Sequence, residues 1–170
     1  MSRLTIAQCN YVLVQRGVEP ADALIDAVMS ASRALVAVAA RSLAAVDEEV
    51  TLPQYRALVV LGQRGALRPA DLATALAVTP STATRMCDRL VAKGLIGRER
   101  SDTDRREVRV GLSAGGRTVV DEVTRRRRAE LGRLLGALPA DRHAAVVAAL
   151  RSFADAAGEV PEPDWAAGLG

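Results

Sequence analysis

The stretch from Thr79 to Gly94 constrains the fold most strongly, because it carries both the start and the stop signals of a helix. Thr79 is a favoured N-cap residue, and Pro80 suits the first helical position, where no backbone N–H is needed. Lys93 lies in the last turn, where the helix dipole favours a cation, and Gly94 allows the left-handed turn that ends many helices. We therefore predict one short helix between these residues.

The two faces of this predicted helix differ in chemistry. Its apolar residues recur at helical spacing and should face a core: Ala83, Met86, Leu90 and Val91. Another face carries hydroxyls and guanidiniums: Ser81, Thr82, Arg85 and Arg89. Hydroxyls hold phosphates and arginine pairs with guanine, so this face suits a helix that enters the major groove of DNA. An ordinary solvated amphipathic helix is the alternative for this stretch taken alone.

Composition favours a helical, globular chain. The 170 residues are 49% hydrophobic, 25% charged and only 2% aromatic, which is enough apolar material for one domain with a real core. The formal charge of +3 permits a nucleic-acid partner without requiring one. No stretch is interpreted as a signal peptide or a membrane span, so we expect a cytoplasmic protein without a membrane partner.

A long helix is predicted over residues 21–46, after an N-terminal stretch (1–17) that fits either a short helix or an ordered arm. The predicted helix is apolar around most of its circumference. Such a helix must be buried or must pack against a second chain. In a chain of this length the second option is attractive.

A helix-turn-helix pattern follows. Thr51 and Gln54 form a capping box that opens a helix through about Gly62. Pro69 starts a small helix over residues 70–76, and the turn at 77–78 leads into Thr79. Two short helices joined by a tight turn, the second with a polar face, are typical of a helix-turn-helix.

A β-hairpin is predicted after Gly94. Residues 107–112 alternate polar and apolar side chains as a half-buried strand does, and 95–100 are compatible with its partner strand. A hairpin behind a helix-turn-helix makes a winged helix. Ser113 should cap the next helix, through about Leu138, and Pro139 opens a last helix to about Ala157. Residues 159–170, with Trp165, are interpreted as a tail.

The chain resembles the MarR (multiple antibiotic resistance regulator) family of bacterial repressors over roughly residues 21–158. The matching runs are LPQYRAL (52–58), DLA (71–73), TRMCDRLVAKGLI (84–96), DTDRREVRV (102–110) and LSAGG (112–116). The combined order of recognition helix, Asp-x-Arg wing and Leu-Ser-x-x-Gly is specific, whereas any one piece alone is weak.

The resemblance implies a mainly α fold, with about six helices and a β-hairpin wing, that forms a homodimer. Within a single domain of residues 1–170, the segment 1–48 would hold the N-terminal arm and a dimerisation helix. Residues 51–112 would form the winged helix-turn-helix lobe, and 113–158 the C-terminal dimerisation helices. The expected function is a DNA-binding transcriptional regulator, a repressor of a pseudo-palindromic operator that a small molecule releases.

The resemblance also implies DNA contacts. It places Arg85 and Arg89 at the major groove and Arg106 at the minor groove, and we propose that Asp104 stiffens the wing loop. Arg68 stands where the family commonly has a capping Ser or Thr, so it is a candidate phosphate contact. The complete set of candidates is Arg68, Ser81, Thr82, Thr84, Arg85, Arg89, Arg105 and Arg106.

A small-molecule pocket between dimer base and DNA lobe is a further implication, and the family often binds phenolic carboxylates. Candidate polar groups are Arg33, Arg41 and Tyr55, since an arginine inside an apolar helix needs an anion. Pairing of Arg33 and Arg41 with acidic residues of the dimer partner is the alternative.

Enzymatic, metal and cofactor sites are not indicated. The lone histidine, His143, has no Cys or carboxylate at ligand spacing, and no phosphate-binding loop is present. The run at 125–128 is four arginines that surround a full helical turn, and we interpret it as a solvated collar pairing with Glu122 and Glu130. A redox-sensing regulator of the same fold that uses Cys9 is the alternative function.

Overall fold

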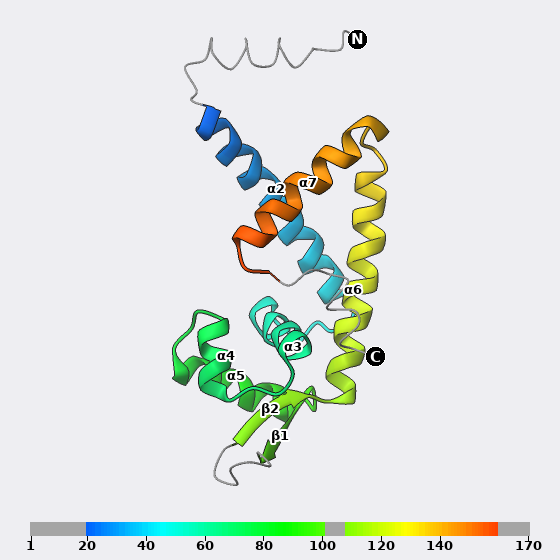
Figure 1. Cartoon of the computed structure of the whole chain (residues 1–170). Coiled ribbons are helices and arrows are strands. Elements are labelled where there is room, and N and C mark those ends of the chain that lie inside the picture. Colours follow the sequence, from blue (N-terminus) through cyan, green and yellow to red (C-terminus); the bar gives the residue numbers. More distant parts are fainter. Residues whose placement is uncertain (1–19, 101–107, 160–170) are drawn as a thin grey trace. The chain divides into compact units, whose positions relative to one another are not determined.

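The computed structural model describes residues 20–100 and 108–159, which are mainly helical with one antiparallel hairpin, as predicted (Figure 1). The chain divides into two compact units, residues 1–39 and 40–170. The helices and strands follow in the order α2 (Pro20–Ala44), α3 (Leu52–Arg64), α4 (Pro69–Ala75), α5 (Pro80–Ala92), β1 (Ile96–Arg100), β2 (Val108–Leu112), α6 (Ala114–Leu135), the 3-10 turn η1 (Ala140–Arg142) and α7 (His143–Ala156).

The described part of the first unit is helix α2 up to residue 39. Its large apolar side chains lie exposed: Leu24, Ile25, Val28, Met29, Leu35 and Val36. By length and composition alone, residues 21–44 are also able to cross a membrane, which the sequence analysis did not anticipate. One such helix is weak evidence for a membrane, because a helix that packs inside a soluble protein passes the same test.

Helix α3 begins at the predicted capping box. Thr51 Oγ1 accepts a hydrogen bond from the Gln54 backbone N–H (3.4 Å), and Gln54 Oε1 accepts one from the Thr51 N–H (3.1 Å). The inner side of α3 forms the centre of the hydrophobic core, to which the other elements of the winged-helix lobe (residues 51–112) contribute, together with Leu43, Val50 and the α6 residues Val120 and Val123. Its fully buried side chains include Leu58, Leu61, Leu72, Leu90 and Val110.

The wing is a two-stranded sheet attached to the lobe by a third short segment. Strands β1 and β2 pair antiparallel, with Ile96 opposite Leu112 and Arg98 opposite Val110. Leu67 bridges Val110 from the other side of β2, through N–O distances of 3.0 and 2.8 Å. Because the side chain of Val110 is fully buried, this middle strand fixes the base of the hairpin in the core.

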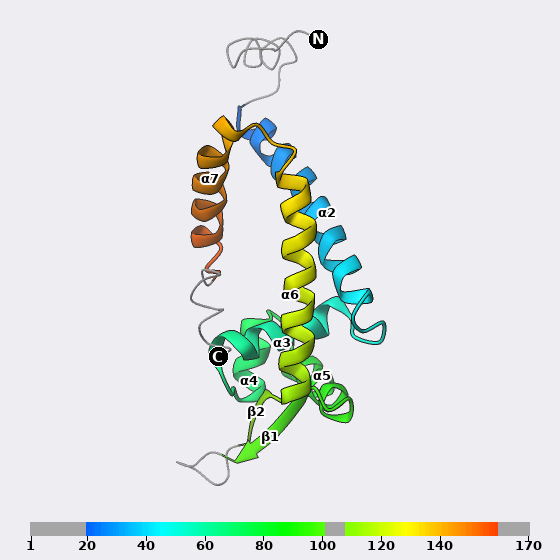
Figure 2. The ribbon, with the colours of Figure 1, turned by 90° about the vertical axis from the view of Figure 1, so that its right-hand side faces the viewer.

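Helix α6 starts where β2 ends, as Figure 2 shows. Ser113 Oγ accepts from the Gly116 N–H (3.0 Å), which confirms the predicted cap, and it donates to the Gly94 carbonyl (2.6 Å). Gly94 itself has a φ of 68°, the left-handed conformation expected at this helix end. One hydroxyl thus connects the end of α5 to the start of α6.

The C-terminal part differs slightly from prediction. Helix α6 ends at Leu135 rather than near Leu138, and the predicted last helix begins with the 3-10 turn η1 before α7. Pro139 explains the interruption, because it has no N–H to continue a helix. Several large apolar side chains on α6 and α7 and between them are exposed: Leu134, Leu135, Leu138, Val147, Leu150 and Phe153.

Candidate nucleic-acid interface

Helix α5 presents its polar face because its opposite side is anchored in the core. Ala83, Cys87 and Leu90 are buried. With about 100° between successive residues, Arg85 points almost directly away from these three, and Arg89 lies about 40° to one side of it. Both arginine side chains are exposed, as the sequence analysis expected of residues that face a partner.

The hydroxyl residues cluster at the amino end of α5. Thr79 Oγ1 accepts from the Thr82 N–H (3.3 Å), so it caps the helix as predicted. It also lies within hydrogen-bond distance of the hydroxyls of Ser81 (3.1 Å) and Thr82 (2.9 Å). Thr84 Oγ1 donates to the Pro80 carbonyl (2.9 Å). These hydroxyls retain lone pairs, but their donor protons are partly engaged within the helix.

A groove of about 360 Å³ separates α5 from the amino end of α3. Its lining consists of Thr51, Pro53, Gln54, Thr82, Arg85, Met86 and Arg89. Two guanidiniums and a threonine hydroxyl border this groove, so its chemistry suits an anion with several oxygens. Arg89 lies on this flank of α5, whereas Arg85 is central on the exposed face.

Two ion pairs anchor the helix at its other end. Lys93 Nζ donates to the Glu49 carbonyl (2.5 Å) and lies 3.6 Å from the Glu49 carboxylate. Arg98 on β1 pairs with Asp88 on α5. Sequence reasoning missed Asp88, Arg98 and Glu49. Residues 95–100 were predicted only as a possible partner strand, and the ten-residue separation gave no signal that Arg98 would contact Asp88.

Arg68 occupies the N-cap position of α4 but makes no side-chain cap. Its guanidinium instead donates two bonds to Asp71, from Nε (2.7 Å) and Nη2 (2.9 Å). The hydrogen bond from Arg68 holds the pKa of the Asp71 carboxyl below its usual value. A phosphate contact by Arg68 would therefore compete with this pair. Arg105, Arg106 and Asp104 lie outside the described residues.

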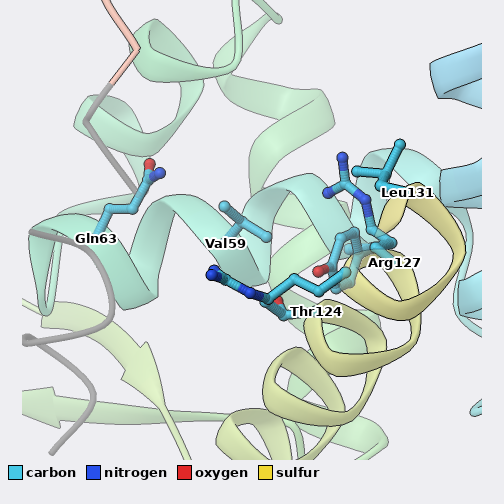
Figure 3. Close-up of a pocket in the computed structure, with 7 residues that line it drawn as sticks. Val59, Gln63, Thr124, Arg127 and Leu131 are labelled. Carbon is cyan, nitrogen blue, oxygen red and sulfur yellow. The ribbon is translucent and has the colours of Figure 1, made fainter. Parts of the chain in front are cut away.

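A second groove, of about 290 Å³, lies between α3 and α6 (Figure 3). Tyr55, Val59 and Gln63 approach from α3, and the α6 residues Thr124, Arg127, Arg128 and Leu131 complete the lining. Arg127 Nε is buried and has no hydrogen-bond partner within residues 20–100 and 108–159. An unpartnered buried donor is costly, so this nitrogen favours an acceptor in the groove.

The predicted pocket residues do not all meet here. Tyr55 lines the α3–α6 groove, but Arg41 pairs with Glu130 through Nε (3.1 Å) and Arg33 donates to Ser30 (3.1 Å). The four arginines at 125–128 also have different surroundings. Arg125 and Arg126 both pair with Glu122, which lowers the pKa of that carboxyl, while the next two arginines line the groove.

Cysteine and metal chemistry gain no support from the described part of the chain. Burial raises the pKa of the Cys87 thiol, which keeps it protonated and unreactive. Cys9 lies outside the described residues. Within residues 20–100 and 108–159, no group of three or more His, Cys, Asp or Glu side chains is placed to hold a metal.

The order of helix α3, helix α4, recognition helix α5 and a two-stranded wing defines a winged helix-turn-helix protein. The model of the MarR family matches residues 50–108, the lobe that carries this site. The chain belongs to the MarR family, which confirms the resemblance found in the sequence.

The chain is also similar to individual bacterial proteins in sequence and in structure. Over 89 residues the chain is 36% identical to the HTH-type transcriptional repressor MdtR of Bacillus subtilis, a match covering 52% of this chain and 57% of MdtR. The chain thus spans about half the length of the curated relatives it matches. Among solved structures, the crystal structure of RV1404 from Mycobacterium tuberculosis superposes on this chain with a TM-score of 0.79. The two sequences are 44% identical, and the match covers 85% of this chain and 98% of RV1404.

A second similar structure is that of Bordetella bronchiseptica BpsR, whose DNA binding is regulated by 6-hydroxynicotinic acid. It is 27% identical, with a TM-score of 0.57, covering 76% of this chain and 91% of BpsR. The family consists of transcriptional regulators, so the prediction that the chain is not an enzyme is confirmed.

Proposed function

We propose that this chain is a sequence-specific DNA-binding transcriptional regulator, a repressor that binds a pseudo-palindromic operator as a homodimer in the cytoplasm. The observation that carries the proposal is the exposed face of α5, where Arg85 stands opposite the buried side of the helix. MdtR is named a transcriptional repressor, and DNA binding is stated for BpsR, which supports the same role here.

Within this proposal the two arginines of α5 have different partners. Arg85 is central on the exposed face, where a guanidinium reaches the base edges of a major groove. Both arginines border the groove next to Thr51 and Thr82, but Arg89 lies about 40° to one side of Arg85, where we propose that the DNA backbone passes. We therefore assign base reading to Arg85 and phosphate binding to Arg89. Arg106 remains our candidate for the minor groove.

Dimerisation is proposed from exposed apolar surface. Large side chains such as Phe153 on α7 and Leu134 on α6 are more than half exposed, at 58% and 53%, and helix α2 carries further ones, such as Leu24. Contiguous apolar surface on a protein in water usually marks an interaction site. A second copy of the chain is the partner we propose for these helices.

Selection of bound sequences from a random duplex pool tests the function and the dimer together. A symmetric dimer with one recognition helix per subunit should enrich a pseudo-palindrome whose half-sites lie about 10 bp apart. The purified full-length chain is incubated with the pool, and the retained duplexes are sequenced. Enrichment of no sequence would refute the proposed function, and enrichment of a single unrepeated half-site would refute the dimer.

Release by a small anionic effector is the second part of the proposal. The α3–α6 groove combines apolar walls, Val59 and Leu131, with the Nε of Arg127, which has no hydrogen-bond partner among the residues that the structure describes. Its volume of about 290 Å³ is at the lower limit for ligand sites, so a single-ring acid is the class that fits. A carboxylate would supply the acceptor that Arg127 lacks.

Titration of operator complexes with benzoate and with 6-hydroxynicotinic acid tests the effector site. We expect wild-type protein to release the operator, and Arg127→Met to need at least about tenfold more acid, because a charged hydrogen bond is lost. Arg125→Met removes a neighbouring arginine that pairs with Glu122 and should respond as wild type does. Equal responses of the two variants would exclude Arg127 from the site.

A further inference from the structure

The ion pair between Asp88 and Arg98 connects the recognition helix to the wing. Arg98 Nη2 donates to Asp88 Oδ1, joining α5 to the middle of β1. Both side chains remain about half exposed, at 54% for Asp88 and 48% for Arg98. An exposed pair of this kind contributes little to the stability of a fold, so its position calls for another explanation.

Asp88 is an unusual residue for the face on which it lies. It is the only acidic residue in the helix from Pro80 to Ala92, and it lies three positions after Arg85. Residues three apart are about 60° apart around a helix, so the carboxylate borders the same exposed face on the wing side. A bare carboxylate there would repel a DNA backbone.

Arg98 lies on a well-anchored strand, from which its guanidinium neutralises the carboxylate of Asp88. Its strand partner is Val110, which is fully buried and is bridged on its far side by Leu67. The backbone at Arg98 is thus fixed to the core of the lobe, and from this strand its guanidinium reaches Asp88 on α5. The pair closes the segment between residues 88 and 98, which contains the turn at Gly94.

We propose that Arg98 is a positioning residue for DNA binding: it neutralises Asp88 next to the polyanion and sets the direction of the wing relative to α5. This inference rests on the proposed function. Arg98 acts through Asp88 and is not itself a DNA contact. Strands β1 and β2 then keep a fixed direction toward the flank of the same half-site that Arg85 reads.

Charge removal in both partners separates this role from a direct phosphate contact. Affinity for the selected operator is measured at two salt concentrations for wild type, Arg98→Met, Asp88→Asn and the double variant. We expect Arg98→Met to bind about tenfold more weakly, because the uncovered carboxylate faces the phosphates. The double variant should return to within about threefold of wild type, because no charge remains uncovered.

The salt dependence and a matched control make the test decisive. If Arg98 touched a phosphate, both variants that lack it would show a salt slope lower by about one, and the double variant would stay weak. Either result, or an unchanged affinity of Arg98→Met, would overturn the inference. Arg126→Met removes a paired arginine of similar exposure from α6 (46%, against 48% for Arg98), and it should change the affinity less than about twofold.

The wing part of the inference has its own readout. Selection with the double variant should give the same central half-sites as wild type but weaker preference at the flanks, because the direction of the wing is no longer fixed. Unchanged flanks would overturn this part. Failure of wild-type protein to select any sequence would instead refute the proposed function on which the inference rests.

Discussion

Arg85→Ala should remove most of the sequence-specific DNA binding. A bidentate contact from arginine to guanine contributes about 1–3 kcal/mol per half-site, and a dimer has two half-sites. The expected loss is therefore about 2–6 kcal/mol, or at least about thirtyfold in the dissociation constant. Titration of a labelled duplex carrying the selected operator measures it directly.

The change should leave the fold intact, because the Arg85 side chain is exposed. Arg133→Ala is a suitable control, since Arg133 is an exposed arginine in the last turn of α6, away from the recognition helix. It removes the same charge and should leave operator affinity nearly unchanged. Equal weakening by both variants would mean that general electrostatics, rather than base reading by Arg85, explains the loss.

Gly116→Ala should destabilise the lobe more than any surface substitution. A Cβ added at Gly116 would lie 2.0 Å from the Leu95 carbonyl oxygen and 3.0 Å from Leu112 Cδ2. Because the nearest atom belongs to backbone, the start of α6 must move away from the base of the wing. Strained packing of this kind costs about 1–3 kcal/mol, and chemical denaturation measures it as a lower unfolding midpoint.

The neighbouring glycine supplies the control. A Cβ at Gly115 would lie 3.4 Å from the Gly94 carbonyl oxygen and 3.6 Å from Ser113 Oγ, which is near-normal van der Waals contact. Alanine is a better helix former than glycine, so Gly115→Ala should leave the unfolding free energy unchanged or slightly raise it. Equal unfolding midpoints for the two variants would contradict the close contact between the start of α6 and the Leu95 carbonyl.

Local signals explain why most of the fold was predictable. The caps at Thr51, Thr79 and Ser113 are each made by a hydroxyl within three residues of the N–H that it accepts from. Such contacts depend on neighbouring residues alone, so the sequence contains them. The alternation from 107 to 112 likewise predicted β2, because a period of two needs no knowledge of the partner strand.

Contacts between distant residues were beyond the sequence. Arg41 was predicted to line a pocket or to pair with a partner chain, yet it pairs with Glu130 of the same chain, 89 positions away. The division of the arginine run between Glu122 and the α3–α6 groove depends on how α6 packs against α3. Helical periodicity gives the direction of each side chain but not the element that it meets.

The central claim is that the exposed face of α5 reads DNA bases through Arg85 and holds the backbone through Arg89. Selection of bound sequences with wild type, Arg85→Ala and Arg89→Ala, at two salt concentrations, tests it most directly. We expect relaxed base preference in each half-site for Arg85→Ala alone. Arg89→Ala should keep the wild-type preference and lower the salt slope by about one per lost contact. Unchanged affinity and unchanged sequence preference in both variants would contradict the account, because another face of α5 would then have to meet the DNA.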